Sequence, residues 1–136
     1  MTALTHATAS LTGRALLASL FLVSGLGKLA APAATIGYIA STGLPFAELA
    51  LGGALVVEIG FAAALLLGYR TRLVAALMAL FSLGTAVLFH HQLGDQGQLI
   101  HFLKNLSIAG GLLHVAAFGA GAFSLDQYLV RKPVLA

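Results

Sequence analysis

Four long apolar runs, separated by short breaks, set the pattern of the chain. A helix that crosses the hydrocarbon core of a bilayer needs about 20 mostly apolar residues, and each run is close to that length. Short connections between consecutive spanning helices make neighbouring helices antiparallel. The pattern therefore predicts an all-α fold, an antiparallel four-helix bundle integral to the membrane. It forms a single domain over residues 1–136, with spans at residues 11–31, 46–68, 72–91 and 100–119.

The break after the first run predicts a further element. Residues 31–46 contain Pro32, Gly43 and Pro45, which interrupt a long helix, but the segment is too apolar for a solvated loop. We therefore expect a re-entrant or interfacial piece with a brief helix at residues 34–40. Such a piece could serve as a lid.

The two ends of the chain are more polar than its middle. Residues 1–10 are small and polar with no strong periodicity, which favours a frayed tail. At the other end, Ser124 is suited to cap a short amphipathic helix on the membrane surface, with Arg131 and Lys132 near lipid headgroups. We assign Asp126 a structural role, because negative charge stabilises the N-terminus of a helix.

Composition excludes a soluble domain. Hydrophobic residues make up 60% of the chain and charged residues 8%, whereas soluble domains carry about 25% charged residues. The net charge of +3 does not indicate nucleic-acid binding, since the basic residues are scattered and form no patch. The positive-inside rule explains them better and places both termini in the cytoplasm. It predicts that the cytoplasmic side carries Arg14, Arg70, Arg72, Arg131 and Lys132.

Lys28 lies near the end of the first run, in the sequence SGLGKL. Its amine could reach the membrane interface, as lysines near helix ends commonly do. Alternatively, Lys28 is a cation in a pocket, where Ser24 and Gly25 allow a neighbouring helix or a ligand to approach. Lys28 also argues against interpreting this run as a cleavable signal peptide, because it interrupts the apolar stretch.

Glu58 and His114 are ionisable residues placed well inside runs, where such groups are costly and usually functional. A rise of 1.5 Å per residue puts Glu58 about 18 Å and His114 about 21 Å from the start of their runs. The two runs enter the membrane from the same side, so we expect these side chains to be partners across the bundle. The pair could fix helix packing, transfer protons or anchor a ligand.

The fourth run carries a polar face, which we expect to line a pocket inside the bundle. At about 100° per residue, one broad face of this helix presents His101, Lys104, Ser107, Gly111 and His114. His90, at the end of the third run, should lie at the same end of the bundle as Lys28, Lys104 and Asn105. This mixture of donors suits a carbonyl, a quinone or a small anion.

A metal site is the alternative interpretation of the histidines. The candidate ligands are His90, His91, Asp95 and His101. Their spacing matches no established zinc signature, and adjacent histidines on a helix point about 100° apart. We therefore predict no metal.

Several sequence fragments occur in a characteristic order. They are SGLGKL in the first run, a glutamate ahead of LLLGYRTR in the second, a histidine at the end of the third, FLKNLSIAGGLL in the fourth and a final SLD. Together they resemble the DoxX family of small four-helix membrane proteins over residues 14–126. The resemblance places the family's lysine at Lys28, its glutamate at Glu58 and its Lys-Asn pair at Lys104 and Asn105.

The resemblance implies a multi-pass protein of the bacterial inner membrane that works as the quinone-facing subunit of an oxidoreductase complex, such as a thiosulfate:quinone oxidoreductase. Quinone would be bound by Lys28, His90, Lys104 and Asn105, while protons would be relayed by Glu58 and His114. The chain has no cysteine, so any thiol chemistry would belong to a soluble partner or to the substrate.

Two other functions stay open. The chain could carry a weak acid or a lipid-like metabolite, with proton coupling at Glu58. It could also be a non-catalytic scaffold that anchors a soluble enzyme, in which case the polar residues would serve only helix packing. Faces rich in alanine and glycine make a homo-oligomer a further expectation.

Overall fold

Eight helical segments follow one another in the computed structural model, which describes residues 2–131. In chain order they are α1 (Ala3–Ala30), α2 (Pro32–Ser41), α3 (Ala47–Leu55), the π-helical segment η1 (Val56–Phe61), α4 (Ala62–Leu67), α5 (Thr71–Phe89), α6 (Gln96–Phe118) and α7 (Leu125–Arg131). Segments α3, η1 and α4 form one continuous helix. It is one of four helices that are long and apolar enough to cross a bilayer, together with α1, α5 and α6. The predicted antiparallel four-helix membrane fold is confirmed.

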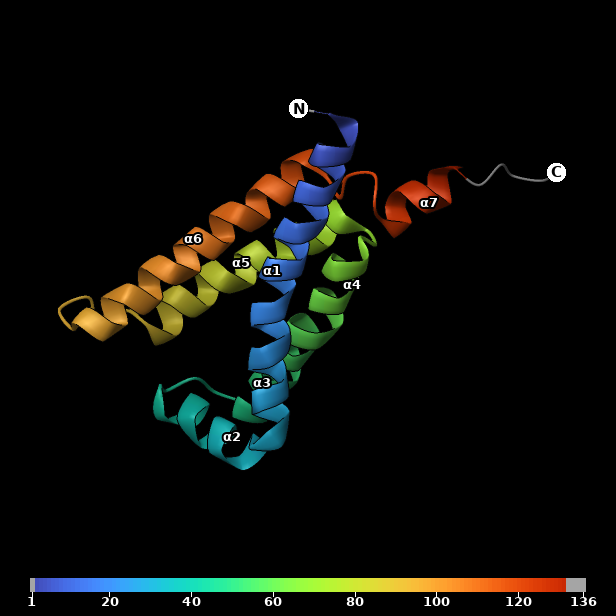
Figure 1. Cartoon of the computed structure of the whole chain (residues 1–136). Helices are drawn as coiled ribbons and strands as arrows, with labels where there is room; N and C mark the ends of the chain where they lie inside the picture. The colour runs from blue at the N-terminus through green and yellow to red at the C-terminus, as the bar shows by residue number, and fades with distance from the viewer. Residues whose placement is uncertain (1, 132–136) are drawn as a thin grey trace.

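The spanning helices form two antiparallel hairpins (Figure 1). One consists of α1 and the α3–η1–α4 helix, and the other of α5 and α6. The hairpins meet where α4 leads into α5 and diverge toward α2, so the bundle opens at one end (Figure 1). The core at the meeting region is built mainly from alanines and aliphatic side chains. Its residues are Ala18, Phe21, Ala62, Leu65, Val74, Ala75, Met78, Ala79, Ala109 and Leu112.

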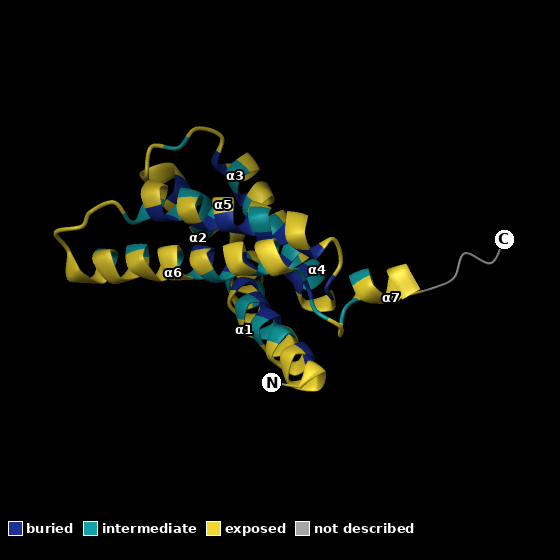
Figure 2. Cartoon of the chain, turned by 90° about the horizontal axis from the view of Figure 1, so that it is seen from above, coloured by how far each residue is buried: buried dark blue, intermediate teal, exposed yellow. Residues whose placement is uncertain are grey.

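The outer faces of the spanning helices are exposed and apolar, and the buried residues lie between the helices (Figure 2). Helix α5 shows this clearly, since Leu80 is 65% and Val87 is 62% exposed. Apolar rows of this extent would be unfavourable in water, but hydrocarbon can cover them. The surface therefore matches a bilayer rather than an aqueous solvent.

Helix α1 begins at Ala3, so the prediction of a frayed tail over residues 1–10 is wrong for the residues that the structure describes. Thr2 caps the helix, because its hydroxyl accepts the backbone N–H of Thr5 at 3.3 Å. Ser10 then donates its hydroxyl to the carbonyl of Ala120 at 2.9 Å, which ties this turn to the loop after α6. The cap and the tertiary hydrogen bond explain the added helical turns.

The predicted short helix after the first span is confirmed as α2. Pro32 stands in its first turn, where its missing N–H costs nothing. Ile39 packs against Leu51 of α3 in a small second core. On the other side, the ring of Tyr38 stacks on Phe89 at the end of α5, with the centroids 5.8 Å apart. Helix α2 therefore bridges the two hairpins where they diverge.

Arg14 is fully buried, at 0% exposure, and does not face the cytoplasmic solvent as the positive-inside pattern predicted. Its Nη1 donates to the carbonyls of Leu65 and Leu66 at 2.9 and 2.7 Å, and its Nη2 donates to the carbonyl of Phe123 at 2.6 Å. Leu65 and Leu66 belong to the last turn of α4, where carbonyls generally lack a partner within the helix, although the carbonyl of Leu65 also accepts the N–H of Gly68 at 3.2 Å. Arg14 thus caps α4 and fastens the loop before α7 to α1.

Asp126 has the structural role that its sequence position indicated, but it acts mainly on α5. Its carboxylate accepts the backbone N–H groups of Arg70 and Thr71 at 2.7 and 2.9 Å, which caps the N-terminus of that helix. Partial burial raises the pKa of Asp126, but the hydrogen bonds from Thr71 and Arg70 and the charge of Arg14 outweigh it and hold the pKa below the usual aspartate value. The carboxylate therefore stays ionised at neutral pH. Ser124 accepts the N–H of Gln127 at 3.3 Å and caps α7 as predicted.

Gly25 allows α1 to approach η1 closely, as its place beside Lys28 indicated. A Cβ atom at Gly25 would lie 2.7 Å from Cγ1 of Ile59 and 3.0 Å from Cβ of Glu58. We expect Gly25→Ala to lower the free energy of unfolding by about 1–3 kcal/mol, because overpacking forces the helices apart. Gly27→Ala is the matched control, since nothing lies within 4 Å of a Cβ at Gly27.

The free energy of unfolding of both glycine variants can be measured by reversible unfolding in mixed micelles. Gly27→Ala should be as stable as the unmodified chain or gain up to about 1 kcal/mol from helix propensity. Equal stabilities of the two alanine variants would contradict the close helix contact at Gly25.

Candidate functional site

A cavity of about 470 Å³ lies between the diverging hairpins and beneath α2. Its lining comes from α1, α2, the α3–η1–α4 helix, α5 and α6, so the relative placement of both hairpins determines its shape. The residues with polar side chains that line it are Ser24, Lys28, Thr35, Tyr38, Glu58, Ser82, Thr85, His90, Lys104 and Asn105. Most of the remaining lining is aliphatic or aromatic.

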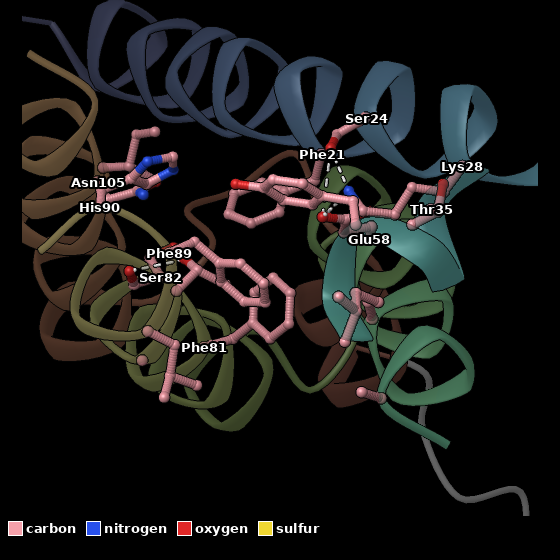
Figure 3. Close-up of a pocket in the computed structure, with 18 of the residues that line it drawn as sticks. Phe21, Ser24, Lys28, Thr35, Glu58, Phe81, Ser82, Phe89, His90 and Asn105 are labelled. Carbon is pink, nitrogen blue, oxygen red and sulfur yellow. Dashed lines mark hydrogen bonds and ion pairs between the residues drawn. The ribbon is translucent and has the colours of Figure 1, made fainter. Parts of the chain in front are cut away.

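One end of the cavity is formed by an ion pair between Lys28 of α1 and Glu58 of η1 (Figure 3). The Lys28 Nζ donates to both carboxylate oxygens of Glu58 at 2.8 Å and to the hydroxyl of Ser24 at 2.8 Å. Ser24 in turn donates to Oε1 of Glu58 at 3.2 Å. Glu58 is 5% exposed, so the pair compensates a carboxylate that would otherwise be costly to bury.

The partner of Glu58 is therefore Lys28, and the prediction of a Glu58–His114 pair is wrong. His114 is exposed and packs on Phe118 of the same helix, with the ring centroids 4.5 Å apart. It is not among the residues that line the cavity. A helical side chain leans toward the N-terminus of its helix, so the amine of Lys28 reaches back from the end of α1 to the depth of Glu58.

Glu58 lies in the one π-helical stretch that the described part of the chain contains. A π segment widens the helix by one residue and is frequent at functional sites. Here it coincides with the position where Gly25 brings the backbone of α1 against Glu58 and Ile59. The sequence of this segment, VVEIGF, does not distinguish a π-helix from an α-helix. Its glycine and β-branched residues also occur in regular α-helices that span membranes.

The other end of the cavity is formed by His90 and Asn105, which lie close together in Figure 3. Nδ1 of His90 is 2.9 Å from Oε1 of Gln98, and its ring stacks on His101 with the centroids 5.0 Å apart. Lys104 also lines the cavity, and its Nζ is 3.2 Å from Nδ1 of His101. The two contacts of His90 join the end of α5 to the first half of α6.

The candidate residues Lys28, His90, Lys104 and Asn105 thus line one cavity, but they do not form a single cluster. In Figure 3 the Lys28–Glu58 pair lies on one side and His90 with Asn105 on the other. The rings of Phe21, Phe81 and Phe89 lie between them. Nothing in the sequence pattern distinguishes these phenylalanines from other apolar residues of the spans, although ligand pockets are commonly lined by aromatic rings.

The predicted polar face of the fourth run lines the cavity only in part. Of its five residues only Lys104 contributes, because Gly111 does not line the cavity and His101, Ser107 and His114 are exposed and outside it. Among the described residues, no three His, Cys, Asp or Glu side chains come together in an arrangement that could hold a metal ion.

Comparison with known proteins places these features in a family. The profile of the DoxX family matches residues 9–91, a range that includes Lys28, Glu58 and His90. The inner membrane protein YqjF of Escherichia coli K12 is 38% identical over 122 residues, which cover 90% of this chain and 92% of that protein. The inner membrane protein YphA of the same organism is 40% identical over 113 residues, which cover 79% of this chain and 81% of that protein. No solved structure matches significantly. With its four spanning helices and these relatives, the chain belongs to the DoxX family of membrane proteins.

Proposed function

We propose that the chain binds a quinone headgroup in the cavity between its two hairpins and is the quinone-binding subunit of a membrane oxidoreductase complex. The observation that carries this proposal is the distribution of polar groups in the cavity. The Lys28–Glu58 ion pair and the His90–Asn105 group occupy separate sides of the cavity, and aromatic rings line the space between them. The hydroxyl groups of Ser82 and Thr85 complete the lining. A quinone has the complementary shape, because its flat apolar ring carries an oxygen at each of two opposite positions.

The size and the location of the cavity support the same ligand. Its volume of about 470 Å³ falls within the range of about 300–1,000 Å³ that is usual for small-molecule sites. Most of its walls are parts of spanning helices, so a ligand dissolved in the bilayer could enter between the diverging hairpins. When bound, a quinone would supply two-electron, two-proton redox chemistry.

Asn105 and His90 are the residues best suited to hold one oxygen. The amide of Asn105 can donate to a carbonyl or accept from a hydroxyl. A His90 ring that donates from Nδ1 to Gln98 leaves its other nitrogen as an acceptor for a ligand hydroxyl. This end can therefore bind both the oxidised and the reduced form of the ring. Lys104 adds positive charge beside it.

The ion-pair end works differently, because all three N–H donors of Lys28 are already used. A ligand oxygen that reaches Lys28 takes the place of the Ser24 hydroxyl, while the two bonds to Glu58 can remain. We assign proton exchange with the ligand to Glu58, which is the buried carboxylate at this end. His114, the second residue of the predicted relay, lies outside the cavity and has no part in the proposal.

The proposed function also needs a soluble partner protein and a location in the bacterial inner membrane. The chain has no cysteine, so thiol oxidation would take place on a soluble partner protein that delivers electrons to the quinone. We place the chain in the bacterial inner membrane, as its two relatives are inner membrane proteins. Arg70 and Arg72, in the turn between α4 and α5, support cytoplasmic termini.

A scaffold function is the second candidate, and one observation favours it. Ser24, Lys28 and Glu58 satisfy one another, as expected of a polar group that only fixes helix packing. A scaffold would anchor a soluble enzyme without binding a quinone, so a binding measurement separates the two functions.

We expect the purified chain in detergent to bind decylubiquinone with one saturable site, as measured by isothermal titration calorimetry. Asn105→Leu should weaken binding about tenfold, because it removes a ligand hydrogen bond inside an apolar site. His114→Leu is the control on the same helix and should bind like the unmodified chain. If none of the proteins binds the quinone saturably, the scaffold function replaces the proposal.

A further inference from the structure

A second depression, of about 620 Å³, lies where the two hairpins meet, away from the cavity described above. It is formed by the turn between α4 and α5, the start of α5, and the loop that joins α6 to α7. Arg70 and Arg72 line it together with Asp126 and the backbone of residues 119–122. Neither the proposed quinone site nor the family assignment gives this surface a role.

The depression carries two positive charges without acidic partners. Arg70 and Arg72 are exposed, and neither forms an ion pair with any residue that the structure describes. Asp126 lines the same depression, but both of its carboxylate oxygens accept backbone N–H groups at the start of α5. The buried guanidinium of Arg14 also acts on that carboxylate. The two exposed arginines therefore remain available to an external anion.

The loop between α6 and α7 passes close to the side chain of Arg72. Gly119 has φ +84°, and a Cβ atom built there would lie 3.4 Å from Nε of Arg72, so the loop backbone runs directly beside the guanidinium. Gly121 has φ +76°, and a Cβ there would lie 2.9 Å from the hydroxyl of Ser10. The loop is thus packed between α1 and Arg72, which reduces the freedom that this side chain would lose on binding.

The depression lies at the ends of spanning helices, beside an apolar surface. Helices α4, α5 and α6 all have one end at it, and α7 leaves it sideways (Figure 1). On α7, the side chains of Leu125 and Leu129 are 38% and 54% exposed. Positive charge and exposed leucines next to each other, at the boundary of a membrane domain, match the headgroup and acyl chains of a lipid.

We propose that this depression is a binding site for an anionic phospholipid, with Arg70 and Arg72 contacting the headgroup phosphate and α7 lying on the acyl chains. The basic turn then has a second role beyond orienting the chain in the membrane. A lipid bound there would contact α5, the loop after α6 and α7 at once, and would stabilise the end of the bundle that Arg14 and Asp126 hold together.

Native mass spectrometry of the delipidated chain, titrated with dioleoyl phosphatidylglycerol or dioleoyl phosphatidylcholine, tests the proposal. We expect the anionic lipid to bind more tightly to the unmodified chain. Arg70→Gln and Arg72→Gln should each weaken that binding about fivefold, since one basic residue near an anionic membrane surface contributes about 1 kcal/mol. Lys104→Gln removes one charge at the opposite end of the bundle and should leave the affinity unchanged.

Three results would overturn the lipid site. They are equal affinities for the two lipids, equal losses in Lys104→Gln and the arginine variants, and complete displacement of phosphatidylglycerol by millimolar inorganic phosphate, which would make the depression a site for a soluble anion. The comparison of the two lipids needs no variant, so it holds even if an arginine substitution impairs folding. It is also independent of the quinone titration, because the two sites share no residue.

Discussion

Replacement of Arg14 by methionine is expected to lower the free energy of unfolding by about 2–4 kcal/mol, the largest stability effect that we predict. The guanidinium is completely buried and donates to the carbonyls of Leu65, Leu66 and Phe123. Methionine fills a similar volume but leaves the carbonyls of Leu66 and Phe123 without this donor at a partly buried site, whereas the carbonyl of Leu65 keeps the N–H of Gly68. Each unsatisfied buried group costs about 1–3 kcal/mol. Unfolding by sodium dodecyl sulfate in mixed micelles measures the loss.

Two further variants separate the loss of the Arg14 hydrogen bonds from the loss of a positive charge. Arg72→Met removes the same charge from an exposed position and should change stability by less than about 0.5 kcal/mol. Arg14→Lys keeps the charge but cannot reach all the carbonyls at once, so its stability should fall between those of the methionine variant and the unmodified chain. A methionine variant at Arg14 as stable as Arg72→Met would contradict the proposed role of Arg14 as a buried cap.

The second prediction concerns the ion pair in the cavity. Lys28→Met should destabilise the chain by about 2–3 kcal/mol, because it leaves the carboxylate of Glu58 buried and unpaired. Glu58→Gln should cost less, about 1–2 kcal/mol, since Lys28 is partly exposed and its flexible amine can move toward the membrane interface. The double variant should recover most of the stability, because it removes both charges and leaves none unpaired.

The same variants separate packing from ligand binding. If Lys28 and Glu58 serve the bound quinone, the double variant regains stability but still binds decylubiquinone more weakly than the unmodified chain. If the pair serves packing alone, the double variant regains both stability and affinity. A double variant no more stable than Lys28→Met would contradict the ion pair itself. Unfolding and titration of the same four proteins give both readouts.

The sequence was sufficient for the fold, because the length and the spacing of apolar runs determine how many helices can cross a bilayer. Pro32 and Gly43 likewise bound the segment that holds α2. The first span begins earlier than its apolar pattern indicated, because Thr2 and Ser10 stabilise it through hydrogen bonds. Such caps depend on single polar residues, which a hydropathy pattern does not register.

The sequence predicted that one end of the bundle would hold Lys28, His90, Lys104 and Asn105. These residues do line one cavity. It could not show that they divide into two groups with aromatic rings between them, because that separation arises from the divergence of the hairpins. Counting residues along a helix gives the depth of Glu58 but not the reach of a lysine side chain from another helix. That is why the partner of Glu58 was misidentified.

His114 and Arg14 illustrate two other limits. The side that α6 turns toward the bundle depends on its packing against α5, and this rotation places His114 on the outside. A basic residue near the start of a span usually marks topology, and the positive-inside rule gives no means of distinguishing it from a buried cap such as Arg14. The π segment around Glu58 also became visible only in the folded chain.

The most direct test of the central claim is mass spectrometry of the small molecules that copurify with the chain, extracted gently from its native membrane. The quinone site predicts that a quinone is present in near-equimolar amount and that Asn105→Leu loses it while His114→Leu retains it. Preparations without quinone, or with the same small amount in both variants, would contradict the quinone site.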